Sequence, residues 1–224
     1  MSNVIAIDGP SGAGKSSVSR IVGERLGFLH VDSGALYRIM TWQCLLRGVN
    51  TEDPDAIAAL AREVSIECCP EAGHIAYTVG GEAPGERIRM PEINAHASKV
   101  ATVKEVRERI TAILRDLTRH GDLVVEGRDI TTAVFPDSPA RFFLTASAEA
   151  RARRRQKEEV EKGIANQTAE AVKASLLARD HMDSTRKFAP LRKADGVMEI
   201  DSSDMTLEQV VETVLEALPS GWRR

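Results

Sequence analysis

The chain has 224 residues, the length of one domain or of one domain that carries inserts. Hydrophobic residues make up 42% and charged residues 28% of it, a balance typical of a globular protein with a sizeable core. The formal net charge of −3 excludes a global basic field for nucleic acid, so any anion must be bound by a local site.

The cysteines point to a reducing compartment. Cys44, Cys68 and Cys69 are odd in number and form no CxxC pair, which argues against a disulfide framework and a zinc site. The N-terminus lacks the basic and apolar regions of a signal peptide, and no stretch approaches the ~20 apolar residues of a membrane span. We therefore expect a cytoplasmic protein with no membrane partner.

Strand-like and helix-like segments alternate from the N-terminus onward. The first predicted elements are the strand Val4–Asp8, the helix Lys15–Leu26, the strand Phe28–Asp32, the helix Leu36–Leu46 and a helix from Asp53 to about Glu63. The pattern then changes between Val64 and Arg89, where VSIECC, HIAYTV and ERIR are separated by turn residues. This spacing predicts a small antiparallel β insert, which the residues alone favour as a surface meander with no role.

The alternation resumes after this insert. The later elements are helices over about Pro91–Val100 and Val103–Arg119, strands Leu123–Glu126 and Ala140–Thr145, a charged helix Ala148–Lys162 that ends at Gly163, a helix from Thr168 to about Asp183, the strand Val197–Asp201 and a final helix that begins with the capping box Thr206–Gln209. The whole series predicts an α/β fold with a five-stranded parallel sheet flanked by helices.

A phosphate-binding loop follows the first strand. The segment Gly9–Ser16 fits the pattern GxxxxGK[ST], with an apolar strand before it and an amphipathic helix after it. Glycines allow backbone N–H groups to approach phosphate oxygens, and the helix directs its positive end at the same anion. Lys15 is expected to reach the β- and γ-phosphates of ATP, and the Ser16 hydroxyl to coordinate Mg²⁺. The predicted nucleotide-binding residues are Gly9, Pro10, Ser11, Gly12, Ala13, Gly14, Lys15, Ser16 and Ser17.

This loop does not identify the kind of nucleotide enzyme. The sequence has neither the NKxD and DxxG motifs of a GTPase nor an LSGGQ-like signature of a transport ATPase. Polar clusters do close the first three core strands, at Asp8, at Asp32–Gly34 and at Glu126–Asp129. Ligands bind at the carboxyl ends of parallel strands, so these clusters are expected to face one crevice.

Two arginine clusters follow in the second half. Arg179, Asp183 and Arg186 are spaced i, i+4, i+7 and share one helix face if the helix persists through Arg186. They suit a phosphorylated, hydrogen-bonding ligand, although spacing alone favours a solvated, ion-paired face. The run from Arg151 to Arg155 is either a solvated charge run or a mobile flap that bears arginines, and composition favours the solvated run.

Several segments together resemble a known family. IDGPSGAGKSS, HVDSGALYR, NAHASKVA, VRE, VVEGRDITTAVFPD and RDHMDSTRKFAPL are similar to motifs of the bacterial cytidylate (CMP) kinases, P-loop phosphotransferases that act on nucleoside monophosphates. The resemblance runs from about Val4 to Leu218. GRDI followed by VFPD, and the D-x-x-R-x-x-APL ending, are its most family-specific parts.

The resemblance implies three working parts. A P-loop core spans 1–37 and 101–218, an acceptor-binding part spans 38–100 with the β insert at about 64–89, a lid spans 150–163, and 219–224 is a tail. The implied substrates are ATP as phosphoryl donor, with Mg²⁺, and CMP or dCMP as acceptor, and the expected protein is a monomer. This reading reverses the surface interpretations of the insert and of the arginine run.

The resemblance also implies roles for individual side chains. The expected cytosine-reading group is Ser33, Arg107, Asp129 and Arg186. The expected sugar group is Ser98, Arg179 and Asp183. Arg38 and Arg128 are expected to clamp the acceptor phosphate, and the expected catalytic residues are Lys15, Arg128, Arg151 and Arg154.

Two departures from the family pattern leave questions open. Ser16 and Ser17 stand where many relatives have Gly-Thr, although Ser16 keeps the hydroxyl for magnesium. Glu126 stands where some relatives have aspartate, so the carboxylate that supports the metal could be Glu126 or Asp8. The alternatives to CMP phosphorylation are another small-acceptor kinase and a nucleotide-gated binding module with slow ATPase activity.

Overall fold

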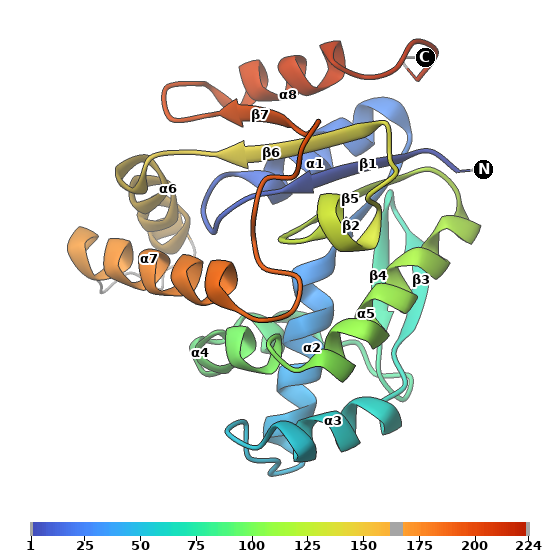
Figure 1. Ribbon diagram of the computed structural model, residues 1–224, viewed down its shortest axis with the longest axis vertical. Helices are drawn as coiled ribbons and strands as arrows, with labels where there is room; N and C mark the ends of the chain where they lie inside the picture. The colour runs from blue at the N-terminus through green and yellow to red at the C-terminus, as the bar shows by residue number, and fades with distance from the viewer. Residues whose placement is uncertain (1, 162–167, 223–224) are drawn as a thin grey trace.

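The apolar runs predicted as strands form the centre of one seven-stranded sheet. The computed structural model describes residues 2–161 and 168–222. Five consecutive parallel strands are, in order across the sheet to its edge at β7, β2 (Leu29–Asp32), β5 (Leu123–Gly127), β1 (Val4–Asp8), β6 (Ala140–Thr145) and β7 (Met198–Asp201). Figure 1 shows these strands running in the same direction, so that their carboxyl ends meet at one edge.

The predicted insert continues this sheet instead of forming a separate one. Strands β3 (Glu67–Glu71) and β4 (His74–Thr78) form an antiparallel hairpin, and β4 joins β2 through the parallel pair His30 and His74. The sheet therefore has seven strands and not the predicted five, because the hairpin adds two strands beside β2. Pro70 lies within β3 and not in a turn, which an edge strand tolerates because its outer side has no ladder to complete.

The third predicted β segment of the insert is also wrong. Gly85–Arg89 forms a short 3₁₀ helix, in which Ile88 is buried while Glu86, Arg87 and Arg89 are exposed. One buried side chain in five matches a single helical turn and not the alternation of a strand.

Eight α-helices connect and cover the strands within the described residues. They are α1 (Lys15–Leu26), α2 (Ser33–Leu46), α3 (Pro54–Glu63), α4 (Pro91–Val100), α5 (Lys104–Asp116), α6 (Ala148–Glu161), α7 (Ala169–Thr185) and α8 (Leu207–Glu216). Helix α2 begins three residues earlier than predicted because the Asp32 carboxylate accepts a hydrogen bond from the Ala35 N–H at 3.1 Å. The predicted end of the lid at Lys162 and Gly163 lies outside the described residues.

Two apolar clusters bury the sheet on both faces. Ala6 and Val125 pack in the cluster that includes α2, α3 and α5, whereas Ile5 and Ile7 pack in the cluster with α1 and α8. Adjacent residues of a strand point to opposite faces, so a strand covered on both sides is apolar throughout. This explains why the central strands appear in the sequence as continuous apolar runs.

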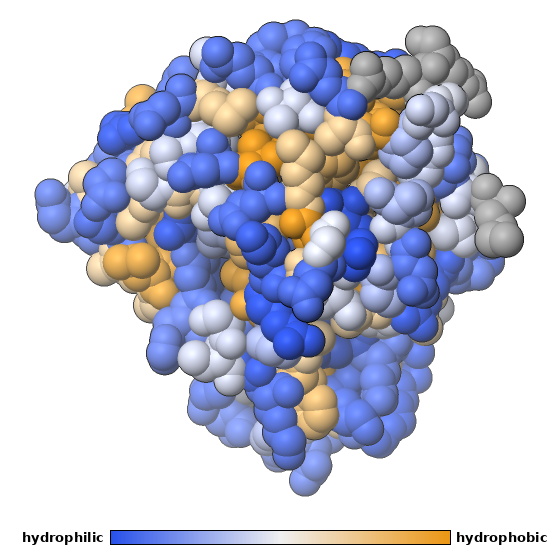
Figure 2. Space-filling view, turned by 45° about the horizontal axis from the view of Figure 1, so that its top comes forward, coloured by the Kyte–Doolittle hydropathy of each residue, from blue (hydrophilic) through white to orange (hydrophobic). Residues whose placement is uncertain are grey.

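The surface is mainly polar. Hydrophilic side chains cover most of the face in Figure 2, with smaller apolar areas between them. The large apolar side chains that are exposed, such as Leu46, Met90 and Met198, come from separate elements. No helix in the described parts of the chain combines the length and the apolar character needed to cross a bilayer.

Candidate active site

The glycine-rich loop begins where β1 ends. Gly9 has a φ of 150°, and a Cβ built on it would lie 1.9 Å from the Leu144 backbone oxygen of β6, so only glycine fits there. Gly12 and Gly14 also have positive φ values, of 77° and 91°. These conformations turn the chain sharply from β1 into α1, whose first residue is Lys15. The loop is thereby placed at the positive end of a helix, as an anion site requires.

Lys15 is buried within this loop. Its ammonium donates a hydrogen bond to the Pro10 carbonyl at 2.8 Å. Burial and, to a smaller extent, the nearby Arg128 lower the pKa of Lys15 to about 7, whereas Glu126 and Asp8 act in the opposite direction. A bound phosphate would favour the charged form, which is the role predicted for this lysine.

The two candidate metal carboxylates have different surroundings. Asp8 is fully buried and accepts hydrogen bonds from the N–H groups of Ile130 at 2.8 Å and Thr131 at 2.7 Å, and from the Thr131 hydroxyl at 2.6 Å. Burial raises the pKa of Asp8 to about 6 against the effect of these bonds. Glu126 instead accepts a hydrogen bond from the exposed hydroxyl of Ser16. Asp8 is thus occupied in holding the segment after β5, and Glu126 faces the loop.

Three of the four residues predicted to read cytosine, Arg107, Asp129 and Arg186, meet in a buried network. Asp129 pairs with Arg107 of α5 at 2.5 Å and with Arg186 at 3.7 Å. Asp183 pairs with Arg186 at 3.5 Å and with Arg128 at 3.0 Å. The chain therefore brings together α5, α7 and the segment after β5, which are far apart in sequence, around two carboxylates.

The shape of this network differs from the predicted helix face. Helix α7 ends at Thr185, and Arg186 has an extended backbone with φ −62° and ψ 146°. The condition that the helix persists through Arg186 is therefore not met. Arg186 still reaches Asp183, and its Nε donates to the Ala189 carbonyl at 2.9 Å. The Arg107 guanidinium also lies 5.2 Å from the ring centre of Tyr37, an arrangement that favours the cation.

Two more predicted arginines lie beside this network with unused donors. Arg38 pairs with Asp32 at 2.7 Å, while its buried Nε has no hydrogen-bond partner among the described residues. The buried Nε of Arg179 likewise has none in the described part of the chain. Burial lowers the pKa of Arg179 to about 10, and the positive charge of Arg128 adds to this effect. Buried cationic donors without partners are a suitable site for a phosphate group.

The predicted serines lie in different settings. The Ser33 hydroxyl donates to the Glu126 backbone carbonyl at 2.6 Å, at the junction of β2 and α2. Ser98 is buried on α4, a helix that contacts α2 and α7. Ser17 is half-buried on α1. The contacts of Ser17, Ser33 and Ser98 with nucleotides stay predictions.

The arginine run of α6 divides into two kinds of side chain. Arg151 is buried, and it donates to the Ser11 carbonyl at 3.1 Å and pairs with Asp180 of α7. Arg154 donates to the Ser202 hydroxyl at 2.9 Å and to the Ser202 carbonyl. Arg155 pairs with carboxylates of its own helix. Arg151 and Arg154 therefore face the phosphate loop, and the solvated-run interpretation fits the exposed Arg153 and the half-exposed Arg155.

Two residues of the site were not predicted from the sequence, although Asp180 lies within the family-like segment RDHMDSTRKFAPL. Asp180 contacts the loop through both Ser11 and Arg151, and Ser202 joins Arg154 to the end of β7. A single aspartate on a charged helix and a serine in a polar loop have no distinctive spacing. Only the packing of α6 and α7 beside the carboxyl ends of β6 and β7, visible in Figure 1, brings them to the loop.

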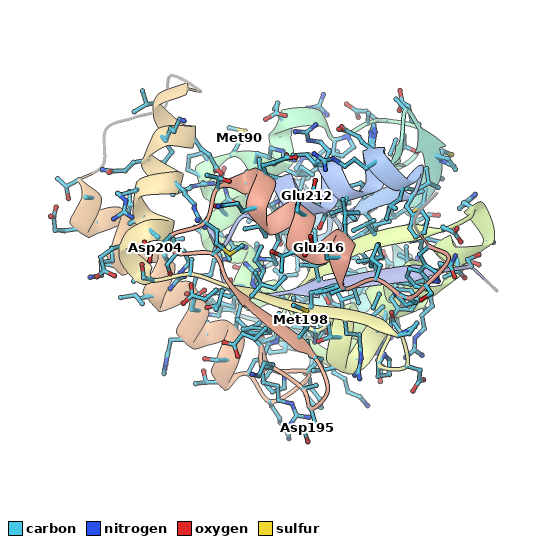
Figure 3. The ribbon with its side chains drawn as sticks, turned by 90° about the horizontal axis from the view of Figure 1, so that it is seen from above. Met90, Asp195, Met198, Asp204, Glu212 and Glu216 are labelled. Atoms are coloured by element: carbon cyan, nitrogen blue, oxygen red, sulfur yellow. The ribbon has the colours of Figure 1, made fainter. Side chains whose placement is uncertain are left out.

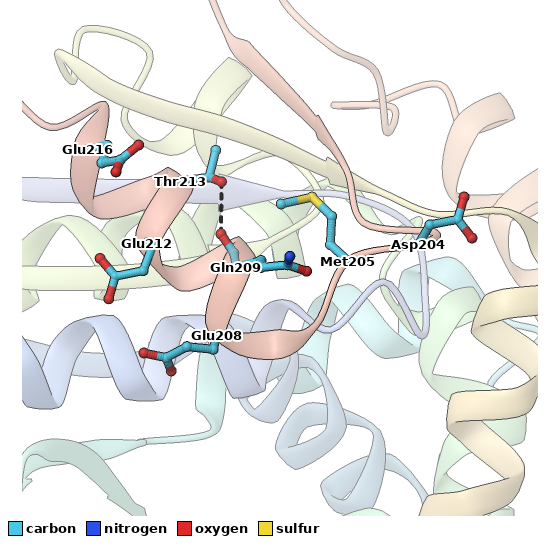
Figure 4. A pocket seen from close by; sticks show the side chains of 7 residues that line it. All are labelled: Asp204, Met205, Glu208, Gln209, Glu212, Thr213 and Glu216. Atoms are coloured by element: carbon cyan, nitrogen blue, oxygen red, sulfur yellow. Dashed lines mark hydrogen bonds between the residues drawn. The ribbon is translucent and has the colours of Figure 1, made fainter.

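A hollow elsewhere on the molecule does not suit a nucleotide. It has a volume of about 400 Å³ and follows α8, which faces the viewer in Figure 3 and is shown closely in Figure 4. Asp204, Glu208, Glu212 and Glu216 contribute four carboxylates to it, and none of its seven lining residues is basic. This lining repels phosphates, so the arginine network and the loop remain the candidate site.

The parallel sheet, the glycine loop at the carboxyl end of β1 and the buried lysine together define an α/β kinase fold of the P-loop class. The family model described as cytidylate kinase matches residues 5–220, and the chain belongs to the cytidylate kinase family.

Individual relatives agree with this assignment. A cytidylate kinase of Streptomyces avermitilis is 46% identical, over 95% of this chain and 90% of the relative. A cytidylate kinase of Mycobacterium avium is 44% identical, over 93% of this chain and 92% of the relative. Among solved structures, an uncharacterized protein from Eubacterium ventriosum matches with a TM-score of 0.54 at 10% identity, covering 97% of this chain and 99% of its own, a likeness of fold alone.

Proposed function

We propose that this chain transfers the γ-phosphoryl group of ATP to CMP and releases ADP and CDP. Family membership over nearly the whole chain supports this reaction. The observation that carries it is the position of Asp129, a buried carboxylate between Arg107 and Arg186 beyond the end of β5. In this proposal the phosphate loop binds the donor phosphates of ATP, and the arginine network binds the acceptor CMP.

The Asp129 network matches the hydrogen-bonding edge of cytosine. A carboxylate accepts from the exocyclic amino group of cytosine, and an arginine donates to its N3 or O2. Uracil has a carbonyl in place of the amino group and an N–H in place of N3. Its carbonyl would face the carboxylate, another acceptor, and its N–H would face the arginine, another donor. Each mismatch leaves a buried polar group without a partner, and cytosine is therefore the preferred base.

Transfer needs positioning and charge compensation more than covalent chemistry by the protein. Arg38 and Arg128 hold the acceptor phosphate, whose oxygen attacks the γ-phosphorus in line, while Arg179 belongs to the group that holds the sugar. Lys15 compensates charge that develops on the β- and γ-phosphate oxygens, and Arg151 or Arg154 adds to this when the lid closes. Exclusion of water by the closed lid favours CMP over hydrolysis.

Magnesium fits the residues present. The Ser16 hydroxyl and the Glu126 carboxylate are adjacent oxygen ligands of the kind that Mg²⁺ takes, and we propose that they hold it directly or through water. The described residues contain no cluster of three or more acidic, histidine or cysteine side chains, so most remaining ligands would come from phosphates and water. When bound, the ion would neutralise charge on the donor phosphates.

Four finer points belong to the same proposal. The chain accepts dCMP as well as CMP, acts in the cytoplasm and is a monomer. Residues 38–100 move as the acceptor-binding part, and 150–163 close as the lid over a core of 1–37 and 101–218. The buried arginines around Asp129 and Asp183 support an acceptor side built for one nucleotide.

A coupled assay of ADP release tests the proposal. ADP should form slowly with ATP and Mg²⁺ alone and much faster when CMP is added, with UMP as the weaker acceptor. Turnover with another small acceptor but not with CMP would identify a different kinase. ADP release that no acceptor stimulates would identify a slow ATPase of the binding-module kind.

A further inference from the structure

Asp180 makes two contacts that connect α7 to the phosphate loop. One carboxylate oxygen accepts a hydrogen bond from the Ser11 backbone N–H at 3.1 Å. The other oxygen pairs with the guanidinium of Arg151 on α6. The same guanidinium donates to the Ser11 carbonyl at 3.1 Å. Both backbone groups of Ser11 are therefore held by one ion pair, which closes a ring of contacts around this residue.

The first turn of α6 also packs directly on the loop. A Cβ built on Gly12 would lie 3.2 Å from the Arg151 Cβ and 3.3 Å from the Arg151 carbonyl oxygen. Arg151 is fixed further by its Nε, which donates to the Ala146 carbonyl at 3.1 Å. Its side chain is 7% exposed and that of Asp180 is 18% exposed, so the pair is largely shielded from water. A shielded, charge-assisted contact is stronger than a surface ion pair.

We propose that Asp180 is a positioning residue, which with Arg151 sets the orientation of the Ser11 peptide and thereby the shape of the phosphate loop that receives ATP. The paired charges cancel, so Asp180 can lie beside the loop without a net repulsion of phosphates. Because Asp180 belongs to α7, which also carries Arg179 and Asp183, the ring couples the donor site to the acceptor network.

Kinetics of an Asp180→Ala variant test this role, and this measurement rests on the proposed function. Loss of both contacts should raise KM for ATP about tenfold, the effect of one charge-assisted hydrogen bond, and change KM for CMP less than twofold. Asp180→Asn keeps an acceptor for the Ser11 N–H but not the ion pair, so its KM for ATP should be intermediate. Lys173→Gln is the matched control, because Lys173 and Glu149 also join α7 to α6 but are exposed.

Amide exchange and nucleotide binding test the same role without turnover. The Ser11 N–H should exchange faster in Asp180→Ala, and ADP affinity by calorimetry should fall about tenfold, while Lys173→Gln matches the wild type. If Asp180→Ala does not fold, the Ser11 amide exchange and the ADP affinity are measured on Asp180→Asn. Equal changes in both KM values, or unchanged Ser11 exchange with unchanged ADP affinity, would overturn the proposal. Wild-type protein that binds ADP but does not phosphorylate CMP would reject the proposed function alone.

Discussion

The two sides of the candidate site hold their charges in different ways. On the acceptor side, side chains pair with other side chains, as Asp129 does with Arg107 and Arg186. On the donor side, side chains bind the backbone of the phosphate loop, as Lys15 does at Pro10 and Arg151 does at Ser11. A substitution on the acceptor side should therefore change which base is recognised. One on the donor side should change the shape of the loop and the use of ATP.

Lys15→Ala should have the largest effect. Removal of the ammonium loses charge compensation in the transition state, so kcat should fall by about 10²–10³ with either acceptor. The free energy of unfolding should hold or rise, because burial disfavours the lysine charge. Steady-state kinetics and urea unfolding measure the two effects. Lys104→Ala, an exposed lysine on α5, is the control, and near-normal kcat in folded Lys15→Ala would reject the phosphate-loop assignment.

Asp129→Ala should have the next largest effect, on the acceptor alone. The variant loses the acceptor for the cytosine amino group, so kcat/KM for CMP should fall by about one to two decades. The value of kcat/KM for UMP should fall much less, and KM for ATP should barely change. Kinetics with both acceptors measure the CMP:UMP preference, which should shrink.

The competing interpretation is that Asp129 only braces arginines. The arginines that Asp129 could brace are Arg107 and Arg186, because Arg128 pairs with Asp183 instead. Bracing alone would reduce CMP and UMP turnover equally, and an unchanged preference would reject the base-reading role. Thermal denaturation of Asp129→Ala and Asp129→Asn should accompany the kinetics, because an unpaired buried arginine destabilises the fold.

The raised pKa of Asp8 predicts that the free energy of unfolding depends on pH. Its folded pKa of about 6 lies above the ordinary 3.8, so between these values the folded protein keeps a proton that the unfolded chain has released. The contribution of Asp8 to the free energy of unfolding is therefore largest in acid, and it falls by about 3 kcal/mol as the pH rises from about 4 to about 6. Urea unfolding of wild type and Asp8→Asn over this range measures it. A wild-type-minus-variant difference that is flat with pH would contradict the prediction.

Ser202→Ala should have the smallest effect, and on the donor side only. The Ser202 hydroxyl accepts from Arg154 at 2.9 Å and donates to the Thr145 carbonyl at 3.0 Å. Its loss removes roughly 1 kcal/mol of hydrogen bonding, so KM for ATP should rise about fivefold while KM for CMP stays constant. Ser203→Ala is the control, because the Ser203 hydroxyl donates to Asp201 and accepts from the Ser147 N–H but does not contact Arg154. An equal rise in both KM values would show that the two sides are not independent.

Much of the fold could be predicted because local signals and burial agree. Strands β1 and β5 are nearly continuous apolar runs, and the glycine loop has a fixed pattern between β1 and α1. The hairpin was predicted, but its union with the sheet was not. A single pair between His30 and His74 makes that union, and nothing in either residue specifies a partner strand.

The site was less predictable than the fold. The sequence marked Arg179, Asp183 and Arg186 through helical spacing, yet the helix ends before Arg186. Asp180 and Ser202 were not predicted, because their contacts with Ser11, Arg151 and Arg154 arise from packing between elements far apart in the chain. The choice between Asp8 and Glu126 also required three dimensions, since only the contacts with Thr131 and Ser16 separate them.

The edge strand β3 has a consequence for how copies of this chain meet. An uncovered strand edge is a template on which another chain can add a strand. Pro70 has no N–H to offer, and Glu67 and Glu71 place negative charge at both ends of the strand. Two such edges brought together would repel each other and lack a donor at Pro70. This edge of the sheet is thus protected against the addition of a strand from a second copy.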